Sequence, residues 1–164
     1  MAPHPCEAFV HMTTHYDVPG ESLVQALAQA LKKEKDIAPP DWSGFVKTAV
    51  HKEKSPVQPD WWYFRTASIL RKIGINGPIG TERLSRHYSG ARDRGAKPNR
   101  SNNGSRKVIR LIMQQLEIAG LIQKAKQGGR SVTSKGQSIL DNTAFDVKKV
   151  LEKEMSLLLS LIHI

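Results

Sequence analysis

The sequence predicts a mainly α-helical, winged-helix-like domain with one small β-hairpin as its wing. Two observations support this fold class. Several stretches repeat apolar residues at helical spacing, and the clearest spans residues 105–120. Directly after it, residues 120–133 hold two short runs separated by Gly128–Gly129, which is the pattern of a β-hairpin. A hairpin joined to the end of such a helix is typical of a winged helix.

The first half of the chain contains three predicted helices. Residues 22–33 begin with a capping box of Ser22 and Gln25 and carry a leucine stripe. A short helix is expected at residues 42–50. Asp60 is placed to cap a third helix, whose first turn is the aromatic run Trp61–Phe64. Such aromatics can stack on bases, but their helical spacing predicts that at least two of the four lie in the core.

The second half supplies the helix-turn-helix. A short helix is predicted at residues 81–88, with Leu84 directed inward. The clearest helix starts from Ser105 as its N-cap and ends at Gly120, a residue suited to the position after a helix. Between these helices, residues 89–104 include almost no apolar side chains. We therefore expect an irregular loop there.

The sequence divides into three parts. Residues 1–19 are expected to be a flexible N-terminal extension, and residues 20–145 form the winged-helix-like domain. A last helix starts at the capping pair Thr133–Ser134, and its apolar stripe continues to Ile162. Residues 146–164 are therefore expected to be a helical C-terminal extension.

The net charge of +10 is confined to one window. Residues 61–110 hold twelve Lys and Arg against only Glu82 and Asp93, a local net charge of +10. The other 114 residues hold thirteen basic and thirteen acidic side chains. A solvated helix face usually mixes both signs, so the window predicts a polyanionic partner. The candidate contacts are its basic residues: Arg65, Arg71, Lys72, Arg83, Arg86, Arg92, Arg94, Lys97, Arg100, Arg106, Lys107 and Arg110.

The long linker at residues 89–104 bears on which polyanion is bound. In a DNA-binding helix-turn-helix, a turn of about three to four residues sets the second helix for the major groove. The linker here is much longer and rich in Arg and Asn, so it would obstruct groove entry. A flexible basic arm suits an irregular folded RNA instead. Structured RNA is the predicted partner, and a winged-helix DNA-binding regulator is the alternative, which dimerisation on a palindrome would indicate.

Other functions find little support in the sequence. No Gly-rich phosphate loop, paired carboxylates or nucleophile constellation is present, so we expect no enzyme, no cofactor and no small-molecule substrate. Cys6 has no partner for an internal disulfide, and its spacing to His11 and His15 supports a zinc site less well than a flexible tail.

No apolar stretch approaches the roughly 18 residues of a membrane span. A cytoplasmic protein without membrane contact is expected, since no secretory or transit layout is present.

Several long strings resemble one known family. In order from residue 42 to residue 144, they are "FVKTAVHKEKSP", "DWWYFRTASILRKIGINGPIG", "RLSRHYSGARDRGAKP", "VIRLIMQQLEIAGLI" and "GRSVTSKGQSILD". They are similar to the archaeal and eukaryotic e-type small-subunit ribosomal protein nineteen family. The resemblance implies a helical, winged-helix-like protein in the head of the small subunit, bound to its rRNA and to neighbouring ribosomal proteins. It also implies a cytoplasmic location in the ribosome, with a nucleolar stage, subunit assembly and rRNA maturation in eukaryotes.

The same resemblance implies particular contacts. The family's basic rRNA-facing positions fall on Arg65, Arg71 and Arg110, and its glycine-rich basic loop falls on residues 89–95. Two residues depart from the family pattern. Ser89 replaces a usual glycine, and Arg106 replaces an apolar residue after "GS".

Overall fold

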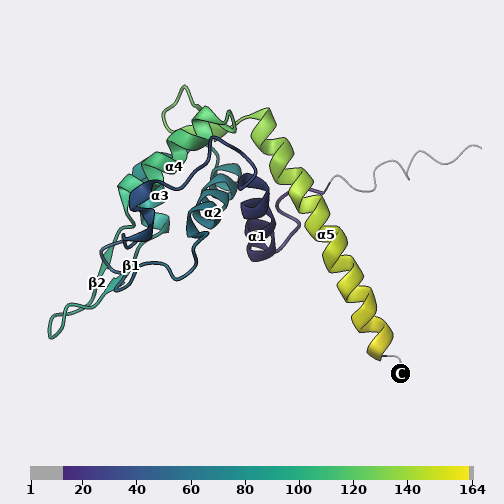
Figure 1. The fold of residues 1–164 in the computed structure, drawn as a ribbon, viewed down its shortest axis with the longest axis horizontal. Coiled ribbons are helices and arrows are strands. Elements are labelled where there is room, and N and C mark those ends of the chain that lie inside the picture. Colours follow the sequence, from purple (N-terminus) through teal and green to yellow (C-terminus); the bar gives the residue numbers. More distant parts are fainter. Residues whose placement is uncertain (1–12, 163–164) are drawn as a thin grey trace, which may run out of the picture.

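Five α-helices and two short β-hairpins form the fold in the computed structural model, which describes residues 13–162 and their side chains as far as Glu154 (Figure 1). The mainly helical class is confirmed. In order, the elements are α1 (Gly20–Leu31), the 3-10 helix η2 (Asp41–Gly44), α2 (Trp61–Asn76), α3 (Thr81–His87), β1 (Gly90–Arg92), β2 (Arg100–Asn102), α4 (Arg106–Ile118), β3 (Ile122–Lys124), β4 (Arg130–Val132) and α5 (Ser134–Ile162).

The main core lies between α1, α2, α3 and α4. Trp62 is fully buried there, and its indole N–H donates a hydrogen bond to Gln115 Oε1 at 2.9 Å. Burial of this large ring therefore leaves no unpaired indole donor. Trp61 is also buried, which confirms that at least two of the four consecutive aromatics lie in the core.

Helix α4 follows its predicted pattern. Ser105 is the N-cap, and its hydroxyl oxygen accepts a hydrogen bond from the Val108 backbone N–H at 3.5 Å. Gly120 follows the helix with a φ of 73°, a left-handed conformation that favours glycine. Leu116 is buried and Arg110 is exposed, so the apolar and basic faces separate as expected.

The wing is present where the sequence predicts it. Strands β3 and β4 pair antiparallel, and Gly128 and Gly129 form the turn with φ angles of 87° and 84°. Ile79, just before α3, extends this sheet by one bridge, since it exchanges two backbone hydrogen bonds with Arg130 at 3.0 and 3.1 Å. The wing is therefore joined both to the end of α4 and to the segment that leads into α3.

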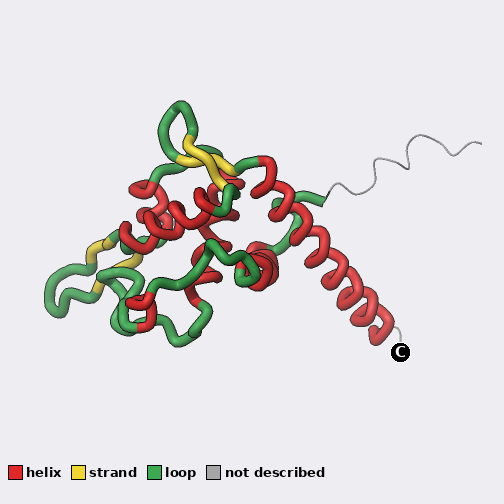
Figure 2. Tube along the Cα trace, turned by 45° about the horizontal axis from the view of Figure 1, so that its top comes forward, coloured by secondary structure: helices red, strands yellow, loops and turns green. Residues whose placement is uncertain are grey.

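Two local predictions were wrong. Residues 89–104 are not irregular throughout, because β1 and β2 pair as a second antiparallel hairpin (Figure 2). This hairpin has no apolar face, so it lacks the alternation that marks a strand in a sequence. The short helix expected at residues 42–50 is only the 3-10 turn η2, followed by irregular chain that is held by a bridge between Ala49 and Gly104.

Two helix starts also differ from the expected caps. Helix α1 begins at Gly20 and has no side-chain cap, so the predicted pairing of Ser22 with Gln25 is not formed. Asp60 does occupy the N-cap position of α2, but its carboxylate accepts from Lys32 Nζ at 3.0 Å and caps no backbone N–H.

Residues 13–19 lie against α5. The buried ring of His15 places Nδ1 3.2 Å from Asp141 Oδ1, and the His15 backbone N–H donates to the same oxygen. Val18 packs with Ala144 and Val147 between α1 and α5. Helix α5 runs unbroken across residue 145 and continues past the body of the protein (Figure 1). The division of the chain at residues 19 and 145 stays a prediction.

Candidate nucleic-acid interface

The hairpin β1–β2, hereafter the arm (residues 90–102), projects from the end of the molecule opposite α5 (Figure 1). Every side chain from Ala91 to Ser101 is exposed. Its turn is shaped by Asp93, whose carboxylate accepts a hydrogen bond from the Gly95 backbone N–H at 2.9 Å. The arm therefore contributes nothing to the core and presents its side chains to solvent.

The arm carries four basic residues and one acidic residue. Arg92, Arg94, Lys97 and Arg100 line one hollow of about 490 Å³, together with Asp93 and Asn102. None of these four cations forms an ion pair with another described residue. Their charges are consequently available to an external anion, and little of their hydration is lost in the free protein.

A second set of exposed cations lies on α3 and α4. Glu82 is shared between Arg106, at 3.1 Å, and Arg86, at 3.9 Å, and so offsets part of their charge. Arg83 and Arg110 are exposed and pair with no described residue. The ammonium of the exposed Lys107 lies 5.0 Å from the centre of the Trp42 ring, within cation–π range.

Two of the candidate contacts lie against the ring of Tyr88. This residue lies between the end of α3 and the start of β1, a position called the arm's root below. Arg65 Cζ and Lys72 Nζ each lie 4.1 Å from the centre of the Tyr88 ring, and the Tyr88 hydroxyl is 2.8 Å from the Ser68 hydroxyl. Burial raises the pKa of Tyr88 and lowers the pKa of Arg65. Burial also lowers the pKa of Lys72, with a smaller effect from neighbouring arginines. Both cations are half-buried and hold the arm's root rather than facing freely outward.

Arg71 does not point outward as the helical pattern predicted. It is half-buried on α2, and its guanidinium packs against Gly20 at the start of α1, where a Cβ would lie 2.8 Å from Cζ. Its Nε is buried and finds no hydrogen-bond partner in the described chain. The remaining nine of the twelve predicted cations are exposed: Arg83, Arg86, Arg92, Arg94, Lys97, Arg100, Arg106, Lys107 and Arg110.

Sequence reasoning missed three lysines in the loop before α2. Lys52 and Lys54 line a hollow of about 530 Å³ together with Arg65 and Tyr88, and Lys47 lies near Asn102 on another side of the arm's root. Glu53 lies among these lysines, and the surrounding sequence has no excess of positive charge. The lysines therefore fall outside the charged window of residues 61–110. The bridge between Ala49 and Gly104 and the packing of His51 against Gly90 bring this loop to the arm, and no sequence pattern marks either contact.

The described part of the chain contains no candidate metal centre. Residues 13–162 contain no group of three or more His, Cys, Asp or Glu side chains that could hold a metal ion. Cys6 and His11 lie outside the described residues, and His15 is engaged with Asp141. Across the same range, none of the helices is both long and apolar enough to traverse a bilayer.

These features define the class of protein: a winged-helix-like domain with a projecting basic arm. The sequence matches the ribosomal protein S19e family over residues 14–150. It is 42% identical over 146 residues to small ribosomal subunit protein eS19 of Haloarcula marismortui, which covers 87% of this chain and 95% of the relative. The same protein of Thermoplasma acidophilum is 46% identical over 138 residues, covering 84% and 91% of the two chains.

A eukaryotic relative extends the comparison. Small ribosomal subunit protein eS19B of Schizosaccharomyces pombe is 37% identical over 131 residues, which is 80% of this chain and 92% of the relative. The chain belongs to the ribosomal protein S19e family. It is accordingly a ribosomal protein and not an enzyme.

Proposed function

We propose that this protein is a structural component of the head of the cytoplasmic small ribosomal subunit and binds small-subunit rRNA through the arm and the exposed faces of α3 and α4. The observation that carries the proposal is the arm, whose four cations lack ion pairs and project beyond the core. Phosphates can neutralise these charges with the release of counterions. RNA that lies between the arm and the helices would then be held from two directions.

The direct contacts in this proposal are the nine exposed cations named above. Arg65 and Lys72 act through Tyr88 by fixing the arm's root, and Arg71 acts by packing α2 against α1. By supporting a local rRNA fold, the protein would also assist subunit assembly and rRNA maturation, with a nucleolar stage in a eukaryote. Neighbouring small-subunit proteins are its expected protein partners.

The runner-up function is that of a winged-helix DNA-binding regulator, which the wing and the basic start of α4 favour. The arm opposes it, because it stands between α3 and α4 and would meet the duplex before α4 could enter a major groove. A regulator of this type is also expected to dimerise on a palindromic site.

Sedimentation of tagged protein through a sucrose gradient tests the proposal. We expect comigration with small subunits, and loss of comigration when Arg92, Arg94, Lys97 and Arg100 are all replaced by Gln. A control replacement of Lys148, Lys149 and Lys153 by Gln on α5, which removes three charges instead of four, should leave comigration intact, because these residues lie outside the proposed RNA face. A free dimer that sediments apart from subunits and binds duplex DNA would contradict the proposal.

A further inference from the structure

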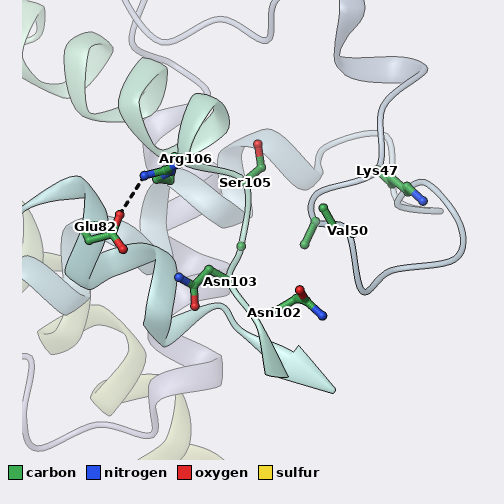
Figure 3. A pocket seen from close by; sticks show the side chains of 9 residues that line it. Lys47, Val50, Glu82, Asn102, Asn103, Ser105 and Arg106 are labelled. Carbon is green, nitrogen blue, oxygen red and sulfur yellow. Dashed lines mark hydrogen bonds and ion pairs between the residues drawn. The ribbon is translucent and has the colours of Figure 1, made fainter. Parts of the chain in front are cut away.

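A depression of about 580 Å³ lies beside the arm's root (Figure 3). In the figure, the chain from Asn102 to Ser105 crosses the middle of the view. Glu82 and Arg106 lie on one side of it, and Val50 and Lys47 lie on the other. The walls thus come from the loop before α2, from α3, and from the segment that links β2 to α4. This volume lies within the range of about 300–1,000 Å³ that is typical of small-molecule binding pockets in proteins.

The floor of this depression is fixed by backbone hydrogen bonds. The Gly104 N–H donates to Ser85 O at 2.9 Å, and the Ser105 N–H donates to Thr48 O at 3.0 Å. Gly104 also approaches α3 closely, since a Cβ there would lie 2.8 Å from Tyr88 Cβ. A floor tied to both neighbouring segments keeps its shape without a ligand, which reduces the entropy cost of binding one.

The side chains around the floor offer unused hydrogen-bonding groups beside an apolar wall. The Asn103 amide has no hydrogen bond to any described residue. Asn102 donates from Nδ2 to Arg100 O at 3.1 Å and keeps its side-chain carbonyl oxygen free. Val50 is 53% exposed, so its isopropyl group is an open apolar surface; it lies on the same side of the floor as Asn102, whereas the Asn103 amide lies on the side of Glu82 (Figure 3). Amide donors and acceptors beside an apolar wall match the edge and the face of a nucleobase.

The charges at the rim suit a phosphate on one side only. Arg106 is paired with Glu82 at 3.1 Å, which offsets part of the positive charge on that side. Lys47 is exposed and pairs with no described residue, so the free positive charge lies on the opposite side, next to Val50. A nucleotide could therefore place its phosphate near Lys47 and its base toward the amides.

We propose that this depression binds one unpaired nucleotide of the RNA, with Asn103 hydrogen-bonding to the base edge, Val50 contacting the base and Lys47 contacting the phosphate. An asparagine amide offers one donor and one acceptor, which can pair in a bidentate way with the adjacent donor and acceptor on the exposed edge of an unpaired base. The proposal rests on the proposed function, because RNA that lies along the arm passes the mouth of the depression. It adds base recognition to a surface otherwise described by charge.

The test compares wild-type protein with Asn103→Leu in binding small-subunit rRNA. Leucine keeps a similar volume but loses both amide groups, so affinity should fall about tenfold, the order expected for one recognised base. The slope of affinity against salt should not change, because no phosphate contact is lost. Chemical probes of the Watson–Crick edge (dimethyl sulfate for adenine and cytosine, a carbodiimide for guanine and uracil) should show one unpaired base that wild-type protein protects and Asn103→Leu leaves reactive.

Two further variants complete the experiment. Asn142→Leu, at an exposed position on α5 outside the proposed RNA face, is the matched control and should preserve both affinity and the footprint. Val50→Asp changes a different wall of the depression and should reproduce the loss of affinity and of footprint seen with Asn103→Leu. Thermal melts establish that each variant is folded. Wild-type affinity and footprint in Asn103→Leu would overturn the nucleotide site while leaving rRNA binding standing. Failure of the wild-type protein to bind rRNA would overturn the proposed function, and the nucleotide site with it.

Discussion

Arg110 and Arg71 carry the same charge and lie on neighbouring helices, yet their surroundings give them different roles. Arg110 is exposed on α4 and pairs with no described residue. Arg71 is half-buried with its guanidinium against Gly20, so its long side chain fills space between α1 and α2. The helical pattern places both on polar faces, but only tertiary packing decides which face is covered. For this reason Arg71→Glu is expected to lower stability, whereas Arg110→Glu is not.

The faces of α4 can be tested with one pair of variants. Arg110→Glu should weaken rRNA binding and leave the melting temperature nearly unchanged, because the residue is exposed. Leu116→Ala should lower the free energy of unfolding by about 2–5 kcal/mol, since it truncates a fully buried leucine. Thermal melts paired with filter-binding assays measure both effects. If Arg110→Glu melted as early as Leu116→Ala, the assignment of faces would be wrong.

Tyr88 offers a second test at the level of a residue. Tyr88→Phe keeps the ring between Arg65 and Lys72 but loses the hydroxyl that pairs with Ser68, so stability should fall by about 1 kcal/mol. Tyr88→Ala also removes the ring and should cost more, with faster amide hydrogen exchange at residues 90–102. Urea unfolding and exchange rates measure these effects. Equal exchange in all three proteins would show that Tyr88 does not hold the arm.

At the level of elements, the two hairpins differ in how firmly they are attached. The wing is joined to Ile79 by backbone bonds and to α4 by Glu117, which pairs with Arg130 at 3.1 Å and Lys124 at 3.6 Å. The arm has two three-residue strands, and its side chains from Ala91 to Ser101 are exposed. An isolated two-stranded hairpin is only marginally stable in water. We therefore expect the arm to open far more often than the wing.

Limited trypsin digestion should reveal this difference. Free protein should be cut first at Arg92, Arg94 or Arg100, whereas cleavage after Lys97 is blocked by Pro98. Arg130 in the wing is the internal control, because its side chain is only 19% exposed and paired with Glu117. Bound rRNA should protect the arm. Equal cleavage of the arm with and without rRNA would remove the arm from the interface.

The wing should also loosen in acid. The hydrogen bond from Arg130 is the main reason why the pKa of Glu117 lies below its ordinary value. Because the pKa of Glu117 is lower in the folded protein, the stabilisation from its pairing with Arg130 is complete above the unfolded-state pKa of about 4.3. This stabilisation is lost as the pH falls through the folded-state pKa. Glu117→Gln should therefore lower stability at about pH 7, by less than about 1 kcal/mol for a partly exposed pair, and by progressively less as the pH is lowered towards 3. Hydrogen exchange of the wing at both pH values measures this, and an equal effect at both would contradict it.

The elements also show what a sequence can predict. The boundaries of α4 and the wing follow from local chemistry: a serine cap, a glycine in a left-handed conformation and a Gly-Gly turn. Hairpin β1–β2 was missed because its strands bury nothing and so show no alternation. The contacts of Arg71, Arg65 and Lys47 were also missed, because each depends on a segment distant in the sequence: α1, the end of α3, and the Ala49–Gly104 bridge.

For the whole molecule, the charged window predicts a strong dependence of RNA binding on salt. With on the order of six phosphate contacts, affinity should fall about a thousandfold between 50 and 200 mM salt, because each contact releases counterions. Replacing Arg94 by Gln should reduce the slope of log affinity against log salt by about one. A flat salt titration of the wild-type protein would contradict the electrostatic account.

The arm's position at one end of the molecule, with α5 at the other, also affects how binding begins (Figure 1). Because unpaired positive charge is concentrated at the arm, the protein has an electric dipole moment along its length. In the field of a polyanion, such a dipole experiences a torque before any surfaces meet, so most encounters should occur with the arm leading. Neutralising the arm should therefore slow association at low ionic strength, even for variants whose dissociation rate is unchanged.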